Sequence, residues 1–252
     1  MSTRAKLTSV AAAVPLVAVT GCAEVSAVAE NSESARPRSS LAGHETVFSE
    51  GLDALPSETL TDWVSYADAV VVVRVSTETS GKLTSDEEQA GEGLELRYVD
   101  LDILATLWTG PRGLTPDSQI TVSPNAWVVS AGEKDRLLVF AEASRMEVGR
   151  EYLVPLVHDD AFDPAWQALA ITSVLPFDGG VVGQGEVLLD ETGATVLPEE
   201  LSNAAQSLWR AGREDVIRLL ESPPPDATAK ELSSLAPTDR FREVQKAAGP
   251  EE

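Results

Sequence analysis

Apolar and polar residues alternate along the middle of this chain in the way that β-strands require. The run from Ala69 to Val75 is almost wholly β-branched, so we predict a central strand with both faces covered. From Leu94 to Leu107 apolar residues recur at every second position, but the parity of these positions changes near Tyr98-Val99. A change of parity predicts a β-bulge that bends the strand.

Further short apolar runs are separated by turn residues and predict additional strands. They lie at 119–123, 127–129, 136–140, 151–157, 168–175 and 185–189. Pro155 favours an edge strand or a bulge for the run that contains it. Residues 76–93 are polar and are predicted to form an exposed loop. Several short strands with Gly-rich turns favour a mainly β fold, a small OB-like β-barrel.

Helical spacing is found at both ends of this strand-rich region. Leu60, Trp63, Val64 and Ala67 follow the i, i+3, i+4, i+7 pattern, which predicts a short helix over 57–66 with Ser57 as its N-cap. A C-terminal helical segment is expected at 198–222, with a kink or break at Gly212, and Trp209 is expected to cap the barrel. Three prolines then stop the helix, and residues 223–252 are predicted to be a tail that is disordered or loosely helical.

The first 22 residues have the three parts of a secretory signal. Arg4 and Lys6 supply the positive charge, and a mostly apolar run from Leu7 to Val19 follows. This run is shorter than the roughly 20 apolar residues that a membrane-spanning helix needs. A cleaved signal is therefore favoured over a transmembrane anchor.

The run ends in Val19-Thr20-Gly21-Cys22, which resembles the lipobox of bacterial lipoproteins. The resemblance implies that Cys22 carries a thioether-linked diacylglycerol, with acyl chains such as palmitate, and becomes the mature N-terminus. The chain contains no other cysteine, so no intramolecular disulfide competes for this thiol. Two acyl chains give durable anchoring, here at the outer face of the bacterial cytoplasmic membrane. The expected organisation is a signal peptide at 1–21, a lipidated tether at 22–50 and a barrel domain at 51–197.

The composition is strongly acidic, with 41 Asp and Glu against 19 Lys and Arg and a net charge of -22. Removal of Arg4 and Lys6 with the signal leaves a mature charge of -24. Such a surface repels phosphate backbones and anionic lipids, so nucleic-acid binding is disfavoured and membrane attachment is assigned to the lipid. The abundance of Ala, Val, Gly and Asp with little Lys is similar to that of actinobacterial proteins.

Few residues suggest catalysis, and no catalytic residue is assigned. His44 lies in the tether, and His158 precedes Asp159, Asp160 and Asp163. A histidine near carboxylates suggests a metal site, but no second His or Cys joins them, so we favour an exposed polar loop and keep His158, Asp160 and Asp163 as weak metal candidates. There is no Gly-x-Ser-x-Gly elbow and no complete calcium loop.

Two of the five tryptophans are candidates for ligand contact. Trp127 and Trp166 lie in turn-rich surroundings after Pro124 and Pro164. The other three occupy positions that apolar periodicity already explains.

The order of the predicted elements also resembles a known fold. Its motifs are a helix ending in Tyr66-Ala67-Asp68, the valine strand 70–73, Leu107-Trp108-Thr109-Gly110, Ile120-Thr121-Val122 and the run from Val148 to Val154. They are similar to the OB-like barrel of secreted bacterial proteins related to the tissue-inhibitor-of-metalloproteinase fold, over about residues 58–157. The chain departs from the inhibitors in lacking the N-terminal disulfide-bonded Cys, so their mode of inhibition is not implied.

Three hypotheses for function follow. The leading one is a lipid-anchored, non-enzymatic binding module for an unknown extracytoplasmic protein or ligand, with no cofactor besides the diacylglycerol on Cys22. The alternatives are an extracytoplasmic hydrolase that uses carboxylates or His158, and a surface protein that binds divalent cations at its acidic loops.

Overall fold

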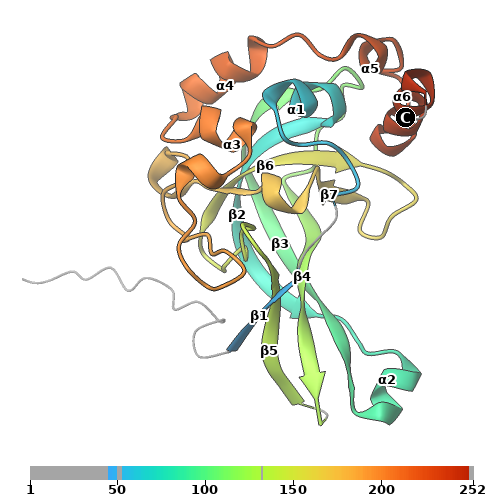
Figure 1. Cartoon of the computed structure of the whole chain (residues 1–252), viewed down its shortest axis with the longest axis vertical. Coiled ribbons are helices and arrows are strands. Elements are labelled where there is room, and N and C mark those ends of the chain that lie inside the picture. The colour runs from blue at the N-terminus through green and yellow to red at the C-terminus, as the bar shows by residue number, and fades with distance from the viewer. Residues whose placement is uncertain (1–44, 50–52, 132, 250–252) are drawn as a thin grey trace, which may run out of the picture. The chain divides into compact units, whose positions relative to one another are not determined.

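The computed structural model of the protein describes residues 45–49, 53–131 and 133–249 (Figure 1). The chain divides into two units, Met1–Arg36 and Pro37–Glu252, and all the described residues belong to the second. The predicted signal peptide, Cys22 and His44 lie outside the described residues. The segment predicted as a tether overlaps the fold at its end, because Glu45–Ser49 forms strand β1.

Strands dominate the middle of the described chain, and helices dominate its C-terminal part. The strands are β1 (Glu45–Ser49), β2 (Ala69–Ser80), β3 (Glu92–Thr109), β4 (Gln119–Ser130), β5 (Glu133–Phe140), β6 (Glu151–His158), β7 (Trp166–Ala168) and β8 (Leu175–Pro176). The α-helices are α1 (Leu60–Tyr66), α2 (Ser85–Ala90), α3 (Asn203–Leu208), α4 (Arg213–Glu221), α5 (Ala227–Glu231) and α6 (Pro237–Ala248). Short 3-10 turns occupy Ile171–Ser173, Asp178–Gly180 and Pro198–Glu200.

The strands form one sheet in the order β1-β5-β4-β3-β2-β6-β7, and β8 pairs with β6. All neighbours are antiparallel except β1 and β5, which are parallel. The predicted mainly β class is confirmed. Strand β7 comes close to β4, yet no ladder between described residues joins the two, so closure of the predicted OB-like barrel is not confirmed.

The valine run of β2 is buried on both faces, as predicted, whereas the second half of the strand is largely exposed. Val70 and Val72 contribute to a cluster with helices α1, α3 and α4, whereas Val71 and Val73 belong to a second cluster with β3, β4 and β6. Side chains alternate between the two faces of a strand, so one run of sequence supplies both cores. Figure 1 shows these helices gathered at one end of the sheet.

Helix α1 begins later than predicted. Its N-cap is Thr59, whose hydroxyl accepts from Asp62 N at 3.1 Å while the Asp62 carboxylate accepts from Thr59 N at 2.8 Å. Ser57, the predicted cap, lies before this capping box, and its carbonyl accepts a hydrogen bond from Trp63 Nε1. The predicted apolar face is correct, because Trp63 and Ala67 are fully buried.

The predicted C-terminal helical segment is divided at Gly212, as its sequence suggests. Helix α3 ends before Trp209, and Gly212 is the N-cap of α4. Trp209 is partly buried and packs against the cluster that α1 and α3 form. No helix among the described residues is long and apolar enough to cross a membrane.

Of the two alternatives predicted for residues 223–252, the disordered tail is wrong for the part that is described, where helices α5 and α6 form. Helices α5 and α6 pack against α1, and Phe241 meets Tyr66 edge to face at a centroid distance of 5.5 Å. Arg240 is fully buried and donates to the carbonyls of Ser65, Ser233 and Leu235. The charged composition suggested disorder, but these backbone acceptors bind both terminal nitrogens of the buried guanidinium, and only its Nε has no partner among the described residues.

The predicted loop at 76–93 was also wrong. Strand β2 continues to Ser80, the six-residue helix α2 follows, and β3 begins at Glu92. Thr84 and Glu87 form a capping box, and Gly91 ends the helix in the left-handed conformation. Polar side chains suggested a loop, although a hairpin exposed to solvent also requires them.

Two predicted strands in the region 168–189 were partly wrong. The first is interrupted by the turn Ile171–Ser173, where the Ser173 hydroxyl donates to the carbonyl of Ala170. The second, at 185–189, forms only an isolated bridge between Leu189 and Thr195. The edge strand predicted from Pro155 is not found, because β6 lies between β2 and β7. Pro155 instead falls between the part of β6 that pairs with β7, 156–158, and the part that pairs with β8, 152–153.

Replacement of Arg240 tests the attachment of the C-terminal helices. Arg240→Ala is expected to lower the free energy of unfolding by about 2–4 kcal/mol, since it removes three charge-assisted hydrogen bonds and leaves a cavity. The matched control is Arg242→Ala on the same helix, whose ion pair with Asp239 is exposed and worth about 0.5 kcal/mol or less. Urea unfolding measures the stability of both variants. Equal losses of stability would contradict the role of Arg240 in attaching the C-terminal helices.

Candidate functional site

A pocket of about 260 Å³ opens at the place where β4 and β7 approach without pairing. Its buried walls are apolar and come from Val122, Met146, Ala170 and Val174, together with buried Ser144. Its more open side includes Leu96, Ser123, Pro124, Asp163, Pro164 and Gln167. An apolar pocket with a few polar groups is the usual form of a ligand site.

The pocket lies beside an interruption in the β3–β4 ladder. Arg97 pairs with Asn125 and Val99 with Val122, so Ser123 and Pro124 together stand opposite Tyr98. This is a β-bulge whose extra residue belongs to β4. Strand β5 pairs only with 126–130 of β4. On that side of β4, the residues before Ala126 have no strand partner among those described. Proline lacks a backbone N–H, but at Pro124 no ladder hydrogen bond is lost for this reason.

A bulge is therefore present opposite Tyr98, but its extra residue lies in β4, and β3 keeps its parity from Leu94 to Leu101. The bulges of β3 itself come later, at Leu104 and Leu107. Arg97, Val99 and Leu101 are all fully buried on one face of the strand. Leu94, Leu96 and Tyr98 are on the opposite face, where Leu96 and Tyr98 contact the pocket. The change of apolar parity in the sequence marks a second apolar face rather than a shift of β3.

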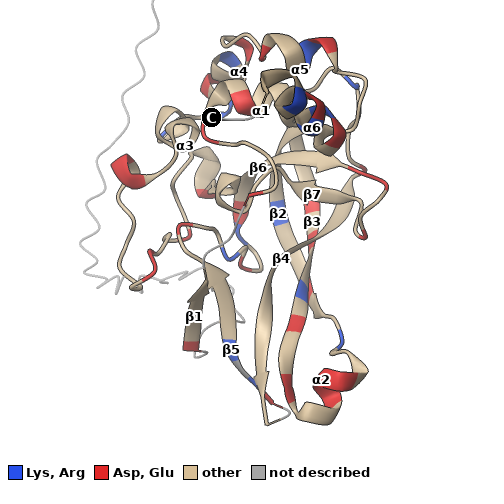
Figure 2. Cartoon of the chain, turned by 45° about the vertical axis from the view of Figure 1, so that its right-hand side comes forward, with Lys and Arg blue, Asp and Glu red and all other residues tan. Residues whose placement is uncertain are grey.

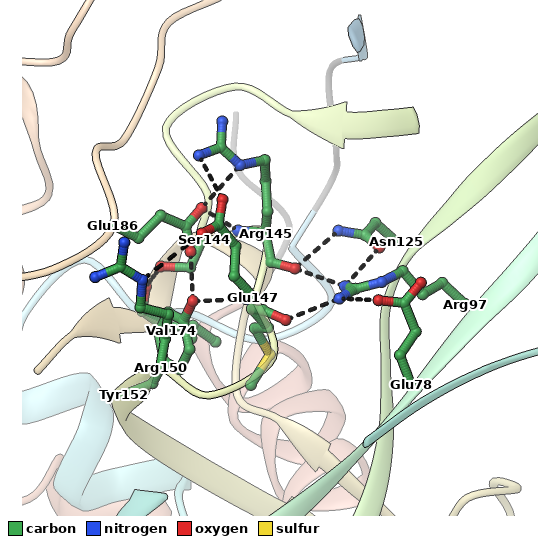
Figure 3. Close-up of polar contacts among 11 residues, drawn as sticks. Glu78, Arg97, Asn125, Ser144, Arg145, Glu147, Arg150, Tyr152, Val174 and Glu186 are labelled. Atoms are coloured by element: carbon green, nitrogen blue, oxygen red, sulfur yellow. Dashed lines mark hydrogen bonds and ion pairs between the residues drawn. The ribbon is translucent and has the colours of Figure 1, made fainter. Parts of the chain in front are cut away.

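A buried arginine fixes one wall of the pocket (Figure 3). The guanidinium of Arg97 is fully buried and donates to the carbonyls of Arg145 at 2.6 Å and Met146 at 2.8 Å. It also donates to Asn125 Oδ1 at 3.2 Å and pairs with Glu78 at 2.9 Å. These contacts hold the segment that carries Met146 against the sheet.

A second buried group, Glu186, holds the same segment from the other side (Figure 3). Its carboxylate accepts from Arg145 N at 2.7 Å and from the Tyr152 hydroxyl at 2.7 Å. The Tyr152 oxygen in turn accepts from Glu147 N at 2.7 Å. Ser144, at the pocket, donates to the carbonyl of Val174 at 2.7 Å. The pocket wall is thus fixed by hydrogen bonds at both ends.

Burial controls the protonation of this network. It raises the pKa of Glu186 above its ordinary value, although the positive charge of Arg145 and the donated hydrogen bonds oppose the shift. Burial and the neighbouring Glu186 charge also raise the pKa of Tyr152, which therefore remains a hydrogen-bond donor. The network therefore positions the backbone that carries Ser144 and Met146.

Asp68 is a second fully buried carboxylate, at the start of β2. Oδ2 accepts from His158 N at 2.8 Å and from Arg112 Nη1 at 3.1 Å, and burial raises its pKa. Within the described ranges, Oδ1 has no hydrogen-bond partner. Asp68 therefore joins the β3–β4 connection to the end of β6 and fixes the backbone of His158.

The predicted metal candidates do not converge. His158 Nε2 lies 3.8 Å from Asp160 Oδ1, and the Asp160 side chain is almost wholly exposed. Asp163 lines the pocket instead. In the described part of the chain no three His, Cys, Asp or Glu side chains gather as a metal site would require.

The two predicted ligand-contact tryptophans have other surroundings. Trp127 is buried and packs with Leu137, Val139 and Phe48, so it leaves little surface for a ligand. Trp166 packs edge to face on His158 at a centroid distance of 4.8 Å, next to the pocket residues Gln167 and Ala168. The lining of the pocket includes neither tryptophan, and ligand contact by Trp127 or Trp166 stays a prediction.

No protein-family model, curated protein or solved structure matches this chain. The resemblances to the lipobox and to the inhibitor-like barrel therefore stay predictions.

The raised pKa of Glu186 predicts how stability changes with pH. The folded state retains its proton to higher pH than the unfolded state does, so this contribution to stability is full below the ordinary Glu pKa and is lost as pH rises through the raised value. Glu186→Gln removes the titration. We expect the stability of the wild type relative to this variant to decrease as the pH rises above the ordinary Glu pKa of about 4.3, as measured by urea unfolding. A constant difference would contradict the assignment.

Proposed function

We propose that this protein is a non-enzymatic binding module that receives an apolar group in the pocket between β4 and β7. The observation that carries this proposal is the pocket itself, with buried Met146 and Val174 inside and half-exposed Leu96 at its margin. Its wall is held rigid by Arg97 and Glu186, and a rigid site loses little entropy when a ligand binds. The lipid on Cys22 would hold the module at the outer face of a bacterial cytoplasmic membrane.

The pocket alone supports only weak binding. Complete burial of one Val, Leu or Phe side chain contributes about 1.5–3 kcal/mol. A dissociation constant of 1 μM requires about 8 kcal/mol. A ligand that binds with useful affinity therefore extends beyond the pocket.

The charge of the protein restricts the ligand class. Asp163 is exposed beside the pocket, and the chain carries a net charge of -22. Its field disfavours anions and favours neutral or cationic ligands. We therefore exclude phosphorylated or carboxylate-rich ligands from the proposal.

A pocket-filling substitution tests the site. Ser123→Trp places an indole at the pocket and is expected to weaken binding of the neutral apolar dye Nile red by about tenfold or more. The matched control is Ser118→Trp, an exposed position just before β4 that is not part of the pocket. Fluorescence titration of the dye measures both, and equal affinities for the two variants would count against the pocket as the site.

Replacement of the single cysteine tests the anchor. Cys22→Ala is expected to be released into the medium or retained as unprocessed precursor, because the thiol that takes the diacylglycerol is absent. Ser26→Ala, which leaves the lipobox unchanged, is the control. Cell fractionation and incorporation of labelled palmitate provide the measurements. A processed, membrane-bound Cys22→Ala protein would refute lipid anchoring.

A further inference from the structure

An exposed apolar strip leads along β3 into the pocket. Leu94 and Leu96 are 48% and 49% exposed, among the most exposed large apolar side chains of the described residues. With Tyr98 they occupy alternate positions on one face of the strand, about 7 Å apart. Leu96 and Tyr98 also contact the pocket, so the strip and the pocket form one continuous apolar surface.

Acidic groups lie at both ends of this surface. Helix α2 carries Asp86, Glu87 and Glu88 in its first turn, and it is held beside Leu94 because Glu87 Oε1 accepts from Leu94 N at 3.2 Å. Figure 2 shows the resulting acidic character of α2. Exposed Glu92 adds a further carboxylate. The nearby bases are Lys82, Arg97 and Lys134, of which Arg97 is paired with Glu78 and Lys134 with Glu95. Asp163 supplies the acid at the pocket end.

We propose that this surface binds an extended segment of a partner protein, in which alternating apolar residues are flanked by Lys or Arg at both ends. The proposal rests on the binding function proposed above and names its ligand class. An extended peptide repeats its side chains about every 7 Å on one face, which matches the spacing of Leu94, Leu96 and Tyr98. One apolar residue enters the pocket, and the next ones cover Leu96 and Leu94.

The charges favour this occupant over a second copy of the chain. Each copy carries a net charge of -22, and two such copies repel each other. Basic residues in a partner segment instead meet α2 at one end and Asp163 at the other. The apolar contacts supply affinity. The charges accelerate association and favour basic over acidic flanking residues in the partner segment.

Two labelled peptides test the proposal in the full chain carrying Cys22→Ala. Both peptides contain three apolar residues at alternate positions. One peptide carries two lysines at each end, and the other carries two glutamates at each end. Fluorescence polarisation at low salt is expected to give binding of the lysine peptide at least about tenfold tighter, since opposite charges attract. The difference should shrink at about 0.5 M salt because exposed charges are screened. Equal affinity of the two peptides overturns the proposal.

Two substitutions locate the binding surface. Leu96→Asp is expected to weaken the lysine peptide about tenfold or more, because it removes one buried apolar contact. Leu197→Asp is the control, since Leu197 is 50% exposed and outside the strip and the pocket. Leu94→Asp serves as a second test if circular dichroism shows that Leu96→Asp is unfolded. Unchanged binding in a folded strip variant overturns the proposal.

The remaining outcomes separate this inference from the proposed function. If Nile red binds at the pocket but neither peptide binds, the peptide proposal fails and the pocket function stands. If neither dye nor peptide binds, both fail. Sedimentation that shows a dimer lost on Leu96→Asp assigns the strip to self-association and also overturns the peptide proposal.

Discussion

The burial of the valine run of strand β2 on both faces is the constraint on which the rest of the fold depends. Val70 to Val73 are fully buried, so the sheet needs one apolar layer on each side. Strands β3, β4 and β6 supply one layer, and helices α1, α3 and α4 supply the other. The sheet therefore has no solvated face at the valine run of β2. Its exposed apolar side chains lie instead at the far end of β3, at Leu94 and Leu96.

Buried charges give this apolar framework its precision. Apolar contacts tolerate small displacements, whereas the donors of Arg97 and the acceptors of Glu186 have fixed directions. Removing such groups from water is unfavourable, and the loss is offset only when several hydrogen bonds are made. Both groups hold the single segment that carries Ser144 and Met146. Arg97 and Glu186 therefore keep this wall of the pocket in a fixed position.

Strong local patterns predicted much of the fold, and long-range contacts account for what they missed. The valine run, the apolar face of α1 and the break at Gly212 follow from periodicity and glycine chemistry, which act over a few residues. The packing of α6 depends on Arg240 meeting the carbonyl of Ser65, a partner that composition does not reveal. The pocket was missed for the same reason, although the parity change at Tyr98 was its signal. Exposed Leu94 could be recognised only once its neighbours were known.

The contact between Arg240 and Ser65 also bears on the order of folding. The two residues are 175 positions apart, so the end of the chain completes the surroundings of its first helix. Contacts of such high sequence separation form slowly because a long loop must close first. As the chain emerges, α1 lacks part of its cover until α6 has been synthesised. The surroundings of α1 are therefore completed only late in synthesis.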